Sequence, residues 1–192
     1  MDIKLLQDKL DNPTINSKQL LGVARLINEK DRESGAFTDP KHFPFYYHLG
    51  KLCEAKSLFH LDYTLGLEDM CFIQGANSER WSGYANGNEE DRLNIATNNI
   101  RFFCKNSSFT TDLDEFTKNV SNKFDAFLVT SPTPLRVFRD EIWNNLNPKG
   151  LLIVDNIYSS ETGEEWFTKF AKSVSREPTF FKTRLGIGII ER

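Results

Sequence analysis

The sequence has few cysteines, no excess of basic residues and no long apolar run. Its three cysteines, Cys53, Cys71 and Cys104, are odd in number, widely spaced and without CxxC spacing, which argues against a disulfide framework or a zinc site. Buried, reduced thiols in a cytoplasmic protein are the simpler interpretation. A formal charge of −3 argues against a general nucleic-acid coat, because such a protein carries basic excess.

No stretch approaches the roughly 18 apolar residues that cross a bilayer, so we expect no membrane segment. The charged start, Met1 to Lys4, has neither the apolar core nor the cleavage site of a signal peptide. What is present is ordinary for a folded domain, since 39% of the 192 residues are hydrophobic and 27% are charged. A chain of this length buries a sizeable core and is expected to form one main domain.

The chain divides into two zones of different texture. Residues 1–56 are typical of an N-terminal helical extension, and residues 57–192 alternate short apolar runs with helical periods. In the first zone, Ser17 is a suitable N-cap for one helix, and residues 45–53 predict another. We expect the aromatic residues of the second helix, including Tyr46 and Tyr47, to pack rather than to bind a ligand.

The second zone predicts five strands with helices between them. Thr111 with Asp114, and Thr162 with Glu165, resemble capping boxes at the starts of two of these helices. Strands separated by helices need crossover connections, which favour a parallel sheet covered on both faces. The predicted strands are residues 57–61, 80–85, 100–104, 124–129 and 151–154.

Two further runs, residues 179–183 and 185–190, lie too close together for a crossover and must form an antiparallel hairpin. The expected fold is therefore a Rossmann-like three-layer α/β/α sandwich. Its mostly parallel, seven-stranded sheet ends in a C-terminal antiparallel hairpin, and the N-terminal helices are added to it. In such sheets ligands bind beyond the carboxyl ends of the strands, near the reversal in strand order.

The pattern from residue 124 to residue 156 is the most specific in the chain. An apolar run beginning Phe124-Asp125 leads into a helix, then into Asn147-Pro148-Lys149-Gly150, and then into Leu151 to Asn156. With the five strand–helix steps and the closing hairpin, this pattern resembles the class I S-adenosylmethionine-dependent methyltransferase fold, and small O-methyltransferases are the nearest subgroup. The resemblance covers residues 57–192.

The resemblance implies a cofactor loop after the first strand, where an acid and alternating glycines are expected. In one register His60 stands for the acid, in the other Asp62 does, and Gly66 is the glycine that both registers keep. His60 is equally consistent with a satisfied core histidine. After the second strand, Ala85 or Asn86 falls where the family bonds the ribose hydroxyls with an acid, and Asn86 offers a neutral amide instead.

The resemblance also implies chemistry at the ends of the fourth and fifth strands. Metal-dependent members place an Asp after the fourth strand and an Asp-Asn pair after the fifth. Asp155-Asn156 matches the pair, but Thr130 stands at the other place without a carboxylate, so we expect no metal. Asp155 and Thr130 become the candidate catalytic residues near the acceptor, with the alternative that Asp155-Asn156 is only a polar strand end.

Two functions follow as alternatives. The first is methyl transfer from S-adenosylmethionine to an oxygen or nitrogen of a small acceptor, whose identity the sequence does not specify. The second is a catalytically inactive binding or structural protein that kept the fold and lost the cofactor. A homodimer through the N-terminal helices is compatible with either.

Overall fold

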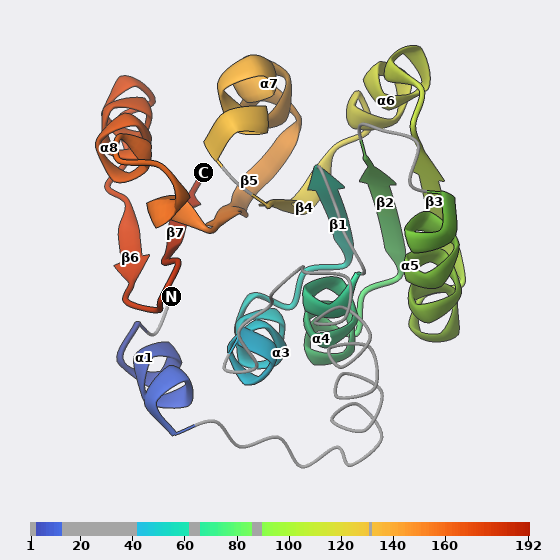
Figure 1. Ribbon diagram of the computed structural model, residues 1–192, viewed down its shortest axis with the longest axis horizontal. Coiled ribbons are helices and arrows are strands. Elements are labelled where there is room, and N and C mark those ends of the chain that lie inside the picture. The colour runs from blue at the N-terminus through green and yellow to red at the C-terminus, as the bar shows by residue number, and fades with distance from the viewer. Residues whose placement is uncertain (1–2, 13–41, 62–65, 86–89, 131) are drawn as a thin grey trace.

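The structure, a computed structural model, describes residues 3–12, 42–61, 66–85, 90–130 and 132–192 (Figure 1). Its strands are β1 (Ser57–Leu61), β2 (Arg80–Tyr84), β3 (Asn106–Thr110), β4 (Phe124–Val129), β5 (Leu146–Asp155), β6 (Thr179–Phe181) and β7 (Ile187–Glu191). Its helices are α1 (Ile3–Asp11), α3 (His42–Cys53), α4 (Leu67–Ala76), α5 (Glu90–Phe103), α6 (Leu113–Val120), α7 (Pro132–Asn145) and α8 (Gly163–Ser173), with a short 3-10 helix at Ile157–Ser159.

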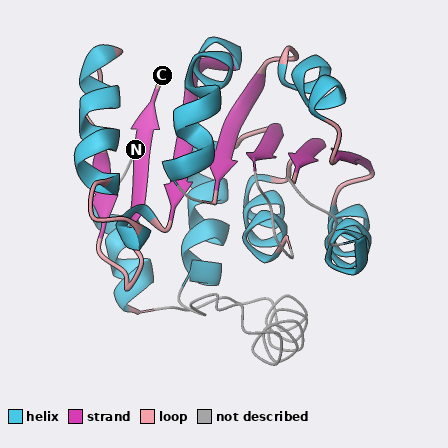
Figure 2. Ribbon diagram, turned by 45° about the horizontal axis from the view of Figure 1, so that its top comes forward, coloured by secondary structure: helices cyan, strands magenta, loops and turns pink. Residues whose placement is uncertain are grey.

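The strands form one seven-stranded sheet in the order β3-β2-β1-β4-β5-β7-β6. Strands β1 to β5 pair in parallel, and β7 pairs antiparallel with both β5 and β6 (Figure 2). The first strand, β1, lies inside the sheet. The next two strands are added outward to β3, and the chain then crosses back to β4 on the other side of β1. This confirms the expected mixed sheet and its closing hairpin.

Helices cover both faces of the sheet, as Figure 1 shows. Helices α1, α3, α4 and α5 share one apolar core with alternate strand residues such as Leu58, Leu128 and Ile153. Helices α6, α7 and α8 share a second core with the other set, which includes Phe59 and Leu152. The two cores follow from the alternation of side chains along each strand, and they confirm the three-layer sandwich.

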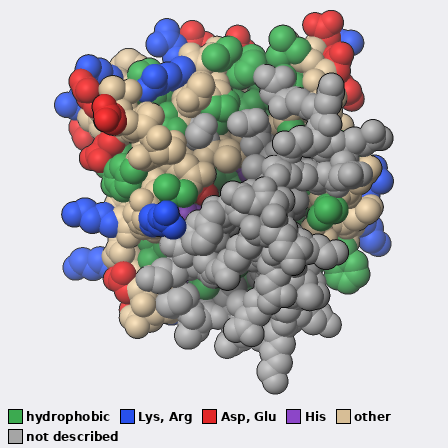
Figure 3. All heavy atoms as spheres, viewed as in Figure 1, with side chains coloured by type: hydrophobic (Ala, Val, Ile, Leu, Met, Phe, Trp, Pro, Cys, Tyr) green, Lys and Arg blue, Asp and Glu red, His purple; other side chains and the backbone are tan. Residues whose placement is uncertain are grey.

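The surface carries charges of both signs, as the nearly balanced composition predicts. Acidic and basic side chains are interspersed around the edge of the face in Figure 3, outside the grey residues. No helix in the described part of the chain is long and apolar enough to cross a membrane.

The third strand was wrongly placed by the sequence pattern. Residues 100–104 were expected to form it, but α5 continues to Phe103 and β3 begins at Asn106. Buried Ala96 and Ile100 are four residues apart, which is helical spacing, while Phe102 points outward and is 81% exposed. The real strand is polar because it lies at the edge of the sheet, where a hydrophobic run would invite aggregation.

The two predicted capping boxes were also wrong in detail. The N-cap of α6 is Asp112, whose carboxylate accepts a hydrogen bond of 2.8 Å from the Glu115 backbone N–H. At α8 the N-cap is Thr162, but its hydroxyl accepts from the Arg136 guanidinium instead of capping the helix. The helix proposed after Ser17 lies outside the described residues.

Helices α3 and α4 approach so closely that glycine is required at their contact. A Cβ on Gly75 would clash with the Tyr47 carbonyl oxygen and lie 3.1 Å from the Lys51 nitrogen. A Cβ on Gly50 would clash with the Phe72 carbonyl oxygen in the same way. This contact fixes α3 over α4, and α3 carries His42 and Tyr46 toward the end of the sheet described below.

We predict that Gly75→Ala destabilises the protein. Helix propensity alone would favour alanine by about 1 kcal/mol. The new methyl group would meet backbone atoms that no rotamer change can move, so overpacking of about 1–3 kcal/mol or more outweighs that gain. Urea denaturation measures the result. The control Asn98→Ala, on the exposed side of α5, should be neutral or slightly stabilising, and equal stability of the two variants would contradict the prediction.

Candidate functional site

Three neighbouring parallel strands carry polar side chains to the same end of the sheet. His60 lies near the end of β1, Thr130 directly follows β4, and Asp155 is the last residue of β5. Because side chains alternate along a strand, all three lie on the face that α3 and α4 cover. This end also contains the reversal of strand order between β1 and β4, which is the usual ligand position in such sheets.

His60 is buried and bonded through both ring nitrogens. Its Nδ1 lies 2.7 Å from Oδ2 of Asp69, and its Nε2 lies 3.0 Å from the Thr130 hydroxyl. Asp69 is in the first turn of α4 and is fully buried, and its Oδ1 accepts a 2.7 Å hydrogen bond from the Trp81 indole N–H. This series of hydrogen bonds therefore links β2, α4, β1 and β4.

The donors and acceptors in this series of hydrogen bonds follow from the chemistry of the four side chains. An indole nitrogen only donates, so Asp69 acts as acceptor toward Trp81. If its second oxygen also accepts, the Nδ1 of His60 must carry a proton, and in the neutral ring Nε2 is then the acceptor. The Thr130 hydroxyl would in that case donate to His60. The arrangement is a carboxylate, an imidazole and a hydroxyl in series, with the hydroxyl at the end of the sheet.

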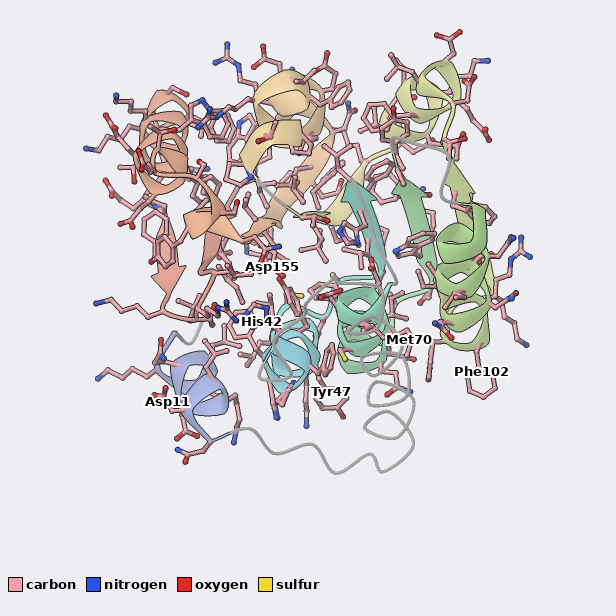
Figure 4. All side chains as sticks on the ribbon, in the orientation of Figure 1. Asp11, His42, Tyr47, Met70, Phe102 and Asp155 are labelled. Atoms are coloured by element: carbon pink, nitrogen blue, oxygen red, sulfur yellow. The ribbon has the colours of Figure 1, made fainter. Side chains whose placement is uncertain are left out.

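A second group of buried polar residues surrounds Asp155. The Nδ1 of His42, from α3, lies 3.5 Å from the Asp155 carboxylate, and Figure 4 shows the two side chains facing each other. The backbone N–H of Asn156 donates to Asp155 at 2.7 Å, and its side-chain amide donates to the Thr130 carbonyl at 3.0 Å. The ends of β4 and β5 are thus tied together beneath α3.

The ionisable groups here are buried enough to shift one another. Burial, with the negative charge of Asp155 as the next cause, raises the pKa of Glu68 from 4.5 to about 7. Burial and the same carboxylate raise the pKa of Tyr46 well above its usual value. The Tyr46 hydroxyl is close enough to feel Asp155, yet it has no partner in hydrogen-bond geometry among the described residues. Several acidic side chains therefore lie close together and buried in this part of the site.

Gly66 occupies the junction between the predicted cofactor loop and α4. It is the N-cap residue of α4 and has a φ of 70°, a backbone conformation that glycine adopts without strain. Ala85 follows β2, is buried, and donates its N–H to the Thr110 carbonyl oxygen. Two other predicted cofactor residues, Asp62 and Asn86, lie outside the described residues. His60, Gly66, Thr130 and Asp155 are all placed at the carboxyl end of the sheet.

The side chains at the ends of β4 and β5 do not fit a divalent cation. Magnesium and calcium prefer several oxygen ligands, usually with more than one carboxylate. Here Thr130 contributes a neutral hydroxyl engaged with His60, and Asp155 faces His42. Among the described residues, no three acids, histidines or cysteines are grouped for a metal ion.

Sequence reasoning missed five of the residues that build this site: His42, Tyr46, Glu68, Asp69 and Trp81. A usable signal was present for two of them, since Glu68 and Asp69 are adjacent acids that begin two residues after the loop glycine Gly66. The other three come from α3 and β2 and join the site only through tertiary packing.

Comparison with known proteins shows which solved structures share this fold. No family model and no curated relative matches the sequence. Solved structures match over nearly the whole chain. One is an O-methyltransferase from Bacillus cereus in complex with SAH, at 14% identity and a TM-score of 0.74, covering 98% of this chain and 97% of that one.

Two further structures agree. The O-methyltransferase TomG from Streptomyces achromogenes, which is involved in tomaymycin synthesis and has SAM bound, is 12% identical with a TM-score of 0.72, covering 100% of this chain and 98% of its own. The cofactor-bound protein Rv0187 from MTB is 11% identical with a TM-score of 0.75, covering 99% and 95%. Together with the strand order, these matches show that the chain has the class I methyltransferase fold.

We predict that Glu68→Gln changes how stability depends on pH. A carboxyl whose pKa is raised on folding holds its proton more tightly in the folded state, so ionising it costs stability as pH rises from 4.5 to about 7. The cost is absent below that window and fully present above it. The variant should therefore match the wild type near pH 4.5 and exceed its stability at pH 8, by on the order of 3 kcal/mol.

Urea denaturation across this pH range measures the difference. Glu177→Gln is the matched control, because Glu177 is exposed on the loop after α8, and it should run parallel to the wild type. A constant offset between Glu68→Gln and the wild type at every pH would contradict the prediction.

Proposed function

We propose that this protein is an S-adenosylmethionine-dependent methyltransferase that acts on an oxygen or nitrogen of a small acceptor. The observation that supports this most strongly is the match over 98% of the chain to an O-methyltransferase in complex with SAH. The polar side chains described above lie at the end of the sheet where such folds take their ligands.

The proposed cofactor contacts are the loop from His60 to Gly66 and the segment after β2. Gly66 starts α4 with a left-handed φ, and a side chain at this position would meet Ile100 of α5. Asp62 would accept a hydrogen bond from the cofactor ammonium, and Asn86, next to Ala85, would bond the ribose hydroxyls. His60 is the first residue of this loop segment, and its ring is held by Asp69.

The charges of the site suit a cationic cofactor. Bound S-adenosylmethionine supplies a methyl group on a positively charged sulfur, already reactive toward a nucleophile. Glu68, Asp69 and Asp155 are buried acids at this end of the sheet, and a nearby positive charge would favour their ionised forms. The remaining task is orientation of the acceptor in line with the methyl group, which by itself accounts for a large part of such rate enhancements.

Three finer features belong to the same proposal: a small-molecule acceptor, a cytoplasmic location and a homodimer through the N-terminal helices. Phe43, Phe45 and Tyr46 are buried within the chain, so a dimer through this region would use other side chains of α1 and α3. Analytical ultracentrifugation tests the dimer.

We predict that S-adenosylmethionine and S-adenosylhomocysteine raise the melting temperature. A ligand at one hundred times its Kd stabilises the folded state by about 2.7 kcal/mol, equivalent to about 5–10 °C for a chain of this size. Thermal-shift titration and calorimetry measure this, with ATP as an adenine-containing control that should have no comparable effect. If neither ligand shifts the melting temperature at millimolar concentration, the chain is instead an inactive relative that has lost the cofactor.

We predict that Asp62→Ala weakens the binding of S-adenosylmethionine by about 10-fold or more, since hydrogen bonds to charged groups contribute about 1.5–3 kcal/mol. Calorimetry gives the affinity, and circular dichroism checks the fold. Asp140→Ala, an exposed acid on α7, should bind as the wild type does. Unchanged affinity in Asp62→Ala would reject this placement of the loop.

A further inference from the structure

The chain of hydrogen bonds that runs from Asp69 through His60 to Thr130 has the order of groups found in proton-accepting sites. A buried carboxylate orients an imidazole, and the imidazole contacts a hydroxyl at the ligand end of the sheet. We propose that His60, held by Asp69, is the general base of the methyl transfer and that it acts through the Thr130 hydroxyl on an acceptor O–H. This inference rests on the proposed function and assigns the acceptor to the class of hydroxyl compounds.

The geometry gives each residue a distinct position. Asp69 is fully buried and His60 is 3% exposed, whereas Thr130 is half-buried. Of the three side chains, that of Thr130 is therefore the most accessible to a bound acceptor. Thr130 is the catalytic residue in this arrangement, because its oxygen would touch the acceptor, and His60 and Asp69 act through it.

The indole of Trp81 sets the direction of the chain. Its N–H donates to one oxygen of Asp69 at 2.7 Å, and the other oxygen, 2.7 Å from Nδ1 of His60, accepts from that nitrogen when Asp69 is ionised. With Nδ1 protonated, Nε2 of the neutral ring accepts from Thr130. Asp69 thereby selects the tautomer that a base needs, as the orienting carboxylate does in other Asp–His pairs.

Several charged and titratable groups face His60 from the elements packed against it. Asp69 and Glu68 approach it from α4, and Asp155 lies at the end of β5. His42 and Tyr46 from α3 lie beyond Asp155. Most of these neighbours are acids, so the imidazolium that forms gains Coulomb attraction in a buried environment.

Thr130 stands where the metal-dependent members of the resembling family place an Asp, and the side chains here do not fit a divalent cation. A side-chain base is another way to activate a hydroxyl. The described contacts supply one, because Thr130 bonds His60 through its side chain while Asn156 holds its carbonyl oxygen.

The proposed step balances. The acceptor oxygen forms a bond to the methyl carbon as the bond from that carbon to the cofactor sulfur breaks, and its electron pair stays on sulfur as a neutral thioether. The acceptor proton passes to the Thr130 oxygen while the Thr130 proton passes to Nε2 of His60. The products are the methyl ether, S-adenosylhomocysteine and an imidazolium, which later releases its proton to water.

The test compares two acceptors that differ in their need for a base. Catechol must lose a proton during the transfer, whereas 4-nitrocatechol is largely ionised in mildly alkaline buffer and needs none. We expect Thr130→Val, a change of similar volume, to lower transfer of a labelled methyl group from S-adenosylmethionine to catechol by about 100-fold. Transfer to 4-nitrocatechol should be nearly unchanged, and Thr130→Ser should retain activity on both.

His60→Gln and Asp69→Asn should show the same selective loss. In these two variants and in Thr130→Val, the pH profile with catechol should lose the rise in rate on its acidic side, which a general base produces as it gives up its proton. Ser78→Ala is the matched control, because it removes a buried hydroxyl that donates to Ala55 at the opposite end of the sheet. This control should methylate both acceptors as the wild type does.

Three results would overturn the relay. In the first, Thr130→Val transfers methyl groups to catechol at the wild-type rate. In the second, Thr130→Val loses transfer to catechol and to 4-nitrocatechol equally. In the third, the wild-type protein binds S-adenosylmethionine but methylates no hydroxyl compound. Calorimetry with S-adenosylmethionine is measured alongside. Failure of the wild type to bind the cofactor refutes the proposed function itself, which is a separate outcome.

Discussion

The buried carboxylate of Asp69 is the constraint on which the rest of the site depends. It is fully buried, and burying an unpaired charge costs several kcal/mol, so its hydrogen-bond partners must be supplied by the fold. Trp81 from β2 and His60 from β1 supply them at 2.7 Å each. Satisfying this one group fixes α4 against β1 and β2. Removing either partner would leave one oxygen of the buried carboxylate without its hydrogen bond.

The position of α4 in turn determines what lies above the sheet. The glycine contact between α3 and α4 seats α3 close enough for His42 and Tyr46 to meet Asp155. Glu68, on the same turn of α4 as Asp69, is buried with it, and its pKa rises first because of that burial and next because of the negative charge of Asp155. Packing of apolar and small residues thus brings these acidic and polar side chains together at one end of the sheet.

The sequence pattern predicted most of the fold because the central strands are continuous apolar runs bounded by turn residues. Phe124 to Val129 is buried on both faces, and no helical period fits it. The pattern failed at residues 100–104, where an apolar helix end was read as a strand, and at the polar edge strand β3. At the site, Gly66, Thr130 and Asp155 could be located from the ends of strands. The sequence left open whether His60 belongs to the cofactor loop or is a core histidine, and the partners of its two ring nitrogens became known only from the structure.

The sequence by itself therefore determined the layer architecture and the end of the sheet at which chemistry belongs, because periodicity and strand ends are local properties. Tertiary structure alone decided which polar groups meet there. Thr130 is 70 residues from His60 along the chain, and Trp81 and His42 come from elements with no shared motif. Hydrogen bonds act over about 3 Å in space, and no spacing in the sequence encodes that proximity.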